Sequence, residues 1–174
     1  MAEIDVRFFL ICLLTDILSA FFVNVFFGLF ATPTVPLLGT AVGRNIISPE
    51  NLIMDLFWIN VGSGFFIVIF ITFFLKFDLE NGKAKPPAWN RKDIPILKHL
   101  PRNMILRGIV FSIICLLIFF PIGVLALFLL QIESLPRWNF IIMKALYGVI
   151  VSVPTAFTVR VCALGDNTDF KKKK

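Results

Sequence analysis

This sequence contains few of the residues that carry enzymatic chemistry. Only 16% of its 174 residues are charged, and His99 is its one histidine, whereas about 25% of a typical soluble domain is charged. A zinc site needs several ligands close together, which one histidine among scattered acids cannot supply. The chain also lacks the G-x-S-x-G, H-E-x-x-H and P-loop motifs. We therefore expect no catalytic residues, no metal, no cofactor and no enzymatic activity.

Cysteine is equally scarce. Cys12, Cys115 and Cys162 each lie in or beside an apolar run, and none belongs to a C-x-x-C motif. An odd number of cysteines without such spacing gives no disulfide framework. We expect all three to act as small apolar packing residues.

What the chain has in excess is apolar sequence. Hydrophobic residues make up 58% of it, and four apolar runs of 20 to 23 residues span 8–30, 56–75, 108–130 and 138–159. About 20 apolar residues are enough to cross a bilayer as a helix. The fold class is therefore predicted to be an all-α membrane protein, with four transmembrane helices in an antiparallel bundle. We expect one domain over 1–164, which includes a long polar connection at 76–107, and a basic disordered tail at 165–174.

The basic residues predict how this bundle is oriented. Of 17 lysines and arginines, 14 are Arg7, the eight within 76–107 and the five from Arg160 onward. Four spans place these segments on one side, and positive charge favours the cytoplasmic side. Both termini are therefore expected in the cytoplasm, with the chain in a cell or inner membrane, or alternatively in an endomembrane.

The net charge of +6 is not taken as a sign of nucleic-acid binding, because the basic residues flank the spans. Such flanks contact lipid headgroups, above all those of anionic lipids. The candidates for headgroup contact are Lys92, Lys98, Arg102 and Arg107.

Four polar side chains inside the spans are the candidate functional residues: Asp16, Asn24, Asn60 and Lys144. At about 1.5 Å per residue, Lys144 shares a level with both asparagines and is separated from Asp16 by roughly 9 Å. We expect Lys144 to face the bundle interior and donate to the asparagine carbonyls, and Lys144→Met to leave the fold intact. The alternative is that Lys144 snorkels to the headgroups.

Small or polar residues recur every four positions in every span except the third, as at Asn60 and Gly64 and in the series Lys144, Gly148 and Ser152. In a bilayer, helix association depends on close backbone approach and interhelical hydrogen bonds. We expect Gly64, Gly148 and Ser152 to lie at helix contacts. A polar path or pocket along the same residues is the functional alternative.

The sequence favours a structural or accessory membrane subunit that associates with itself or with a partner membrane protein. The alternative is a small transporter or channel that uses Asp16 or Lys144 as an intramembrane charge. In having an acid in the first of four spans, the chain resembles the small drug/proton antiporters, although it is longer and has a long second connection.

Overall fold

Four long helices form the body of the computed structural model, which describes residues 6–31, 34–37, 51–81 and 98–167. They are α1 (Val6–Gly28), α2 (Leu52–Glu80), α4 (Met104–Leu129) and α5 (Arg137–Asn167). Each helix is long and apolar enough to cross a membrane. The prediction of four such helices is confirmed. The predicted tail begins too early, because α5 continues to Asn167.

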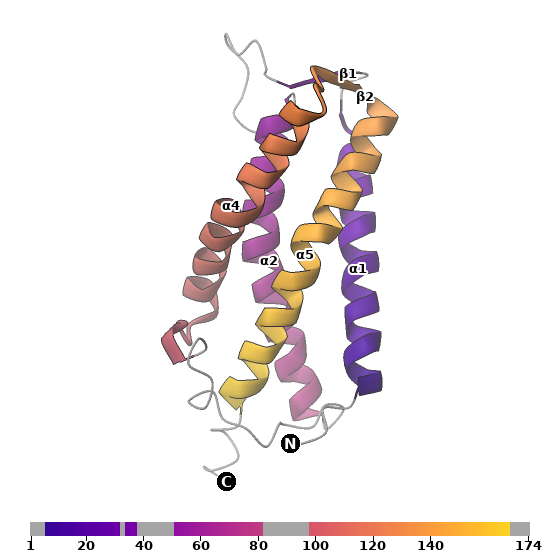
Figure 1. Cartoon of the computed structure of the whole chain (residues 1–174). Helices are drawn as coiled ribbons and strands as arrows, with labels where there is room; N and C mark the ends of the chain where they lie inside the picture. The colour runs from indigo at the N-terminus through magenta and orange to yellow at the C-terminus, as the bar shows by residue number, and fades with distance from the viewer. Residues whose placement is uncertain (1–5, 32–33, 38–50, 82–97, 168–174) are drawn as a thin grey trace.

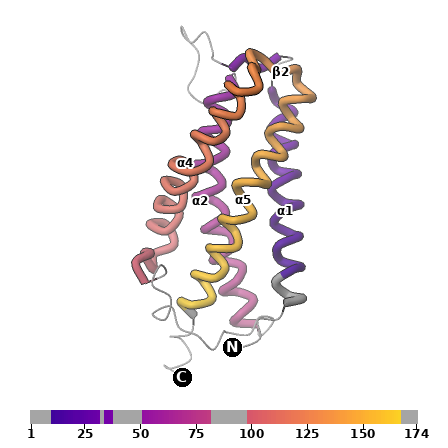
Figure 2. The backbone as a smooth tube through the Cα atoms, in the orientation of Figure 1, coloured from indigo at the N-terminus to yellow at the C-terminus, as the bar shows by residue number. Residues whose placement is uncertain are grey.

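Consecutive helices run in opposite directions, so α1 begins and α5 ends at the same end of the bundle (Figure 1; the backbone path is clearest in Figure 2). α5 packs against both α1 and α2, and α2 also packs closely against α4. By contrast, α1 makes little contact with α2. The α1 helix is therefore held in the bundle through α5.

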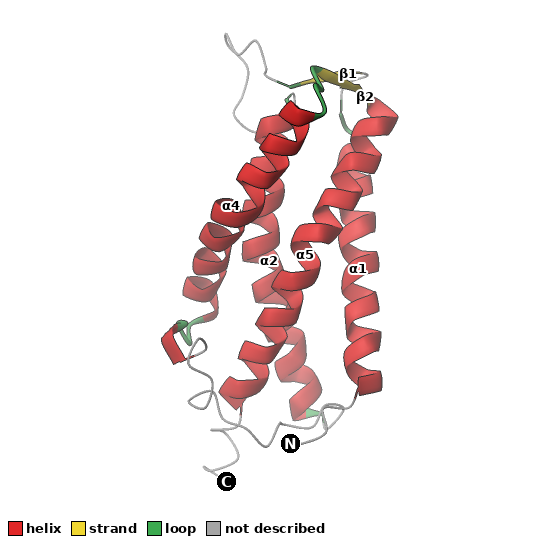
Figure 3. Ribbon diagram, viewed as in Figure 1, coloured by secondary structure: helices red, strands yellow, loops and turns green. Residues whose placement is uncertain are grey.

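Two short strands join the connections at the end of the bundle where α5 begins (Figure 3). β1 (Thr34–Pro36) pairs antiparallel with β2 (Ser134–Pro136), with Val35 opposite Leu135. The side chain of Val35 is fully buried. The sequence did not predict this pairing, because three-residue strands interrupted by proline carry no periodic signal.

Helix ends are set by side chains that cap the backbone. Asn51 precedes α2 and accepts a hydrogen bond from the backbone of Met54 at 2.7 Å. Such a cap satisfies an N–H group that has no partner within the helix. α2 therefore starts several residues before the apolar run predicted from residue 56, and Asp55 belongs to its first turn.

Two glycines allow helices to approach closely. A Cβ added to Gly64 would fall on the backbone of Ser112 and lie 2.8 Å from the carbonyl carbon of Phe111. A Cβ at Gly148 would collide with the side-chain amide of Asn24. Gly64 therefore sets the approach of α2 to α4, and Gly148 sets the approach of α5 to α1.

Candidate functional site: a groove with two ion pairs

A groove lies between α1 and α2, and α5 contributes to its lining. Its volume is about 1160 Å³. It runs from Asp55 and Lys144, near the β1–β2 end of the bundle, to Asp78 and Arg160 near the opposite end. Phenylalanines from α1, from the turn that follows α1 and from α2 make much of its wall: Phe27, Phe30, Phe66, Phe70 and Phe74. The groove is therefore largely apolar, with charged groups toward its two ends.

The first ion pair joins α5 to the start of α2. Lys144 donates to Oδ1 of Asp55 and lies 5.5 Å from the centre of the Phe140 ring. Only 6% of Lys144 and 2% of Asp55 are exposed. Lys144 thus faces the interior, as predicted, and its ammonium group is turned to a buried carboxylate instead of the outer surface of the bundle.

The predicted asparagine partners of Lys144 make other contacts. The amide of Asn60 donates to Leu56 O at 2.7 Å and to the hydroxyl of Tyr147 at 2.8 Å, and that hydroxyl donates to Phe119 O. The Oδ1 atom of Asn60 is buried and has no hydrogen-bond partner among the described residues. The predicted hydrogen bond from Lys144 to Asn60 is therefore not formed.

Asn24 likewise bonds within its own helix. Its amide donates to Ala20 O at 2.8 Å, and its side chain packs against Gly148. Lys144 donates to neither asparagine because Asp55, which the Asn51 cap places in the first turn of α2, is its partner instead.

The second ion pair joins α1 to α5. Arg160 donates to Asp16 Oδ1 at 2.8 Å, and its Nη2 lies 2.7 Å from Oδ2. Arg160 is one of the basic residues predicted to lie at the cytoplasmic face, and it lies seven residues before the end of α5. The packing of α5 against α1, which the sequence could not show, makes Arg160 the partner of Asp16.

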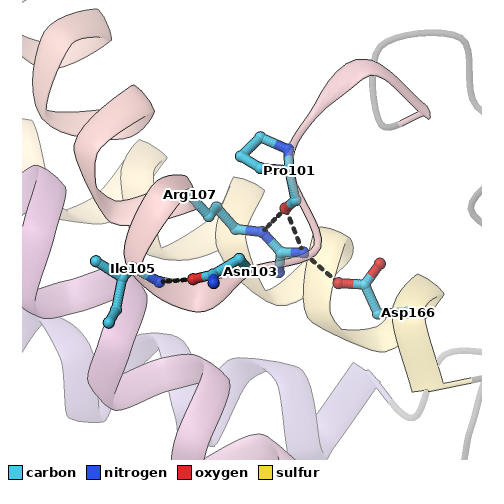
Figure 4. A network of polar contacts seen from close by, with 5 residues as sticks. All are labelled: Pro101, Asn103, Ile105, Arg107 and Asp166. Carbon is cyan, nitrogen blue, oxygen red and sulfur yellow. Dashed lines mark hydrogen bonds and ion pairs between the residues drawn. The ribbon is translucent and has the colours of Figure 1, made fainter.

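A third ion pair fixes the end of α5 beside the start of α4 (Figure 4). Nε and Nη2 of Arg107 both donate to Pro101 O at 3.1 Å, and Nη2 also donates to Asp166. Asn103 caps α4 by accepting from the backbone of Ile105 at 2.9 Å. Arg107 is only 1% exposed. Its predicted role in headgroup contact is therefore corrected, because the guanidinium is used inside the fold.

The other predicted headgroup residues are placed differently. Lys98 and Arg102 are exposed, and Lys92 lies outside the described residues. The predicted packing residue Ser152 lies in the groove, where its hydroxyl is 3.4 Å from that of Ser63.

The groove offers no evident site for a metal. Within the described ranges, no three histidine, cysteine, aspartate or glutamate side chains come together. The arrangement instead suits a hydrophobic molecule with a polar end, because its walls are apolar and each end carries paired charges. Comparisons with known protein families, curated proteins and solved structures give no match to this chain.

Proposed function

We propose that this chain is a multi-pass integral membrane protein whose four helices cross the bilayer as an antiparallel bundle. The helices contain 23 to 31 residues. At ~1.5 Å per residue they are about 34 to 46 Å long, which suits a bilayer of about 40–45 Å including headgroups. Their outward side chains are largely apolar, as at Leu117, which is 72% exposed. A lipid environment is the solvent that favours such a surface.

The proposed orientation places the start of α1, the end of α5 and the connection at 76–107 in the cytoplasm, because most basic residues lie there. A cysteine at position 174, in a background without the three native cysteines, is expected to react with an impermeant thiol reagent only after cells are opened. The exposed Glu133→Cys, at the β2 end, should react in intact cells and serves as the matched control. The reverse pattern of labelling would contradict this orientation.

Within the membrane, we propose a structural or accessory role in which the groove binds a hydrophobic molecule from the bilayer. The groove is the observation that supports this role most directly. α1 is held by α5 and makes little contact with α2. This arrangement leaves the apolar groove, about 1160 Å³ in volume, along the bundle. An accessory role also involves association with a second copy or with another membrane protein through the remaining apolar surface.

Gly62 provides a test of the groove, because it lines the groove and a Cβ there would meet only Phe66, at 3.9 Å. Gly62→Trp should fill the space without disturbing helix packing. We expect it to reduce the lipid that co-purifies with the chain by at least about tenfold, since losing a large apolar contact costs more than about 1.4 kcal/mol. Mass spectrometry of the purified protein measures the bound lipid.

The matched control is Leu117→Trp, which adds the same side chain to an exposed surface of α4, away from the groove. It should leave the bound lipid unchanged. Equal lipid content in Gly62→Trp and Leu117→Trp would exclude the groove as the binding site.

A small transporter is the second candidate, and one observation favours it. Asp16 and Lys144 line the same groove, and each is paired with an opposite charge. The hydroxyls of Thr15, Ser19 and Ser63 also line the groove. Buried charges of this kind commonly mark ion or substrate paths. Reconstitution in liposomes separates the two roles, because a transporter requires flux of ions or solute and an accessory protein does not.

A further inference from the structure

The ion pair between Asp55 and Lys144 has unused hydrogen-bonding capacity. Both residues line the groove and are almost fully buried. Oδ1 of Asp55 accepts from Lys144, but Oδ2 is buried with no hydrogen-bond partner among the residues described. A lysine ammonium has three N–H donors. A buried acceptor without a donor is unfavourable, so a ligand that supplies a donor to Oδ2 would gain affinity.

This ion pair lies at the depth of lipid headgroups when α2 crosses the bilayer as proposed above. α2 has 29 residues, and its length of about 43 Å matches a bilayer including headgroups. Asp55 is in the first turn of α2, about 4.5 Å from the helix start at ~1.5 Å per residue. The headgroup region on each side is about 5–7 Å thick. Trp58 also lines this part of the groove, and tryptophan favours the membrane interface.

Beyond the ion pair, the groove has the shape and surface expected for acyl chains. Val23 and Phe27 of α1 face the space between the helices together with Phe66 and Phe70 of α2. The groove volume of about 1160 Å³ exceeds the roughly 300–1,000 Å³ of most small-molecule sites. A molecule with a polar end and a long apolar body matches this arrangement.

We propose that the groove binds a phospholipid whose headgroup carries a primary ammonium beside its phosphate, as in phosphatidylethanolamine. This inference rests on the proposed function, which places a hydrophobic membrane molecule in the groove. The ammonium donates to Oδ2 of Asp55, and the phosphate accepts from Lys144. Such charge-assisted hydrogen bonds are stronger than neutral ones. A choline headgroup has the same charges but no N–H donor, so it cannot form the first of these bonds.

Native mass spectrometry of the full chain tests this proposal. The protein is purified in detergent with equal amounts of phosphatidylethanolamine and phosphatidylcholine that carry identical acyl chains. We expect one retained lipid per chain, with the ethanolamine lipid favoured by about tenfold, as expected for one additional charge-assisted hydrogen bond.

The double variant Asp55→Asn with Lys144→Gln removes both charges together and leaves no unpaired charge. It should still bind lipid through the apolar walls, with a preference below about twofold once the charge-assisted bonds are lost. Leu117→Trp should keep the preference of the unchanged protein.

The outcomes separate the headgroup assignment from the proposed function. Equal binding of both lipids, or a preference that survives in the double variant, would overturn the assignment and leave the groove as a lipid site. No bound lipid in the unchanged protein would overturn both proposals. A polypeptide held in the groove would overturn the lipid assignment but leave the accessory role in place.

Discussion

Lys144→Met is expected to destabilise the folded protein by about 3–5 kcal/mol, the typical cost of removing one partner of a buried ion pair. The variant would leave the carboxylate of Asp55, which is only 2% exposed, without its partner. This reverses the expectation from the sequence that Lys144→Met leaves the fold intact. The free energy of unfolding is measured in bicelles, for example by steric trapping.

The matched variant is the double substitution Asp55→Asn with Lys144→Gln, which removes both charges and keeps similar side-chain shapes. The double variant should regain most of the free energy of unfolding that Lys144→Met loses, because replacing both partners avoids an uncompensated buried charge. If the double variant is as unstable as Lys144→Met, the ion pair is not the source of the effect. In that case, lost packing against Phe140, whose ring lies 5.5 Å from the ammonium group, would be the cause.

Gly64→Ala is expected to cost about 3 kcal/mol, at the upper end of the usual range for overpacking a well-packed interior. The new methyl group would fall on the backbone of Ser112, which cannot move aside as a flexible side chain can. The hydroxyl of Ser112 also donates to Val61 O at 3.1 Å, so separating α2 from α4 would break this bond. The same unfolding measurement detects the loss.

Gly62→Ala is the control for this substitution, two residues earlier in the same helix. Its methyl group would meet only Phe66, at 3.9 Å. Alanine also has a higher helix propensity than glycine, by up to about 1 kcal/mol. Gly62→Ala should therefore be neutral or slightly stabilising. If Gly62→Ala and Gly64→Ala lower the free energy of unfolding equally, the close approach of α2 to α4 is not the cause of the destabilisation.

The groove explains why charge is found inside so apolar a chain. Asp16, Asp55, Lys144 and Arg160 all line it, and they form two ion pairs that join α5 to its neighbours. Each pair is locally neutral, which reduces the cost of placing charge at membrane depth. The same residues therefore hold the helices together and provide the charged groups of the groove.

The sequence by itself determined that this protein has four long apolar helices. Length and hydropathy are local properties, and a run of about 20 apolar residues is sufficient evidence for each helix. The small residues at Gly64 and Gly148 were also visible, because their four-residue spacing places them on one face of a helix. The inward direction of Lys144 followed from that same spacing.

Only the tertiary structure decided which polar groups meet. Asp55 lies in the first turn of α2 and Arg160 lies within α5, so the packing of whole helices decides which charged side chain faces each of them. Asp55 is 89 residues from Lys144, and Arg160 is 144 residues from Asp16. Contacts over such separations depend on the rotation and depth of whole helices, which no local pattern specifies. The groove has the same origin, since it exists because α1 packs on α5 and leaves α2 apart.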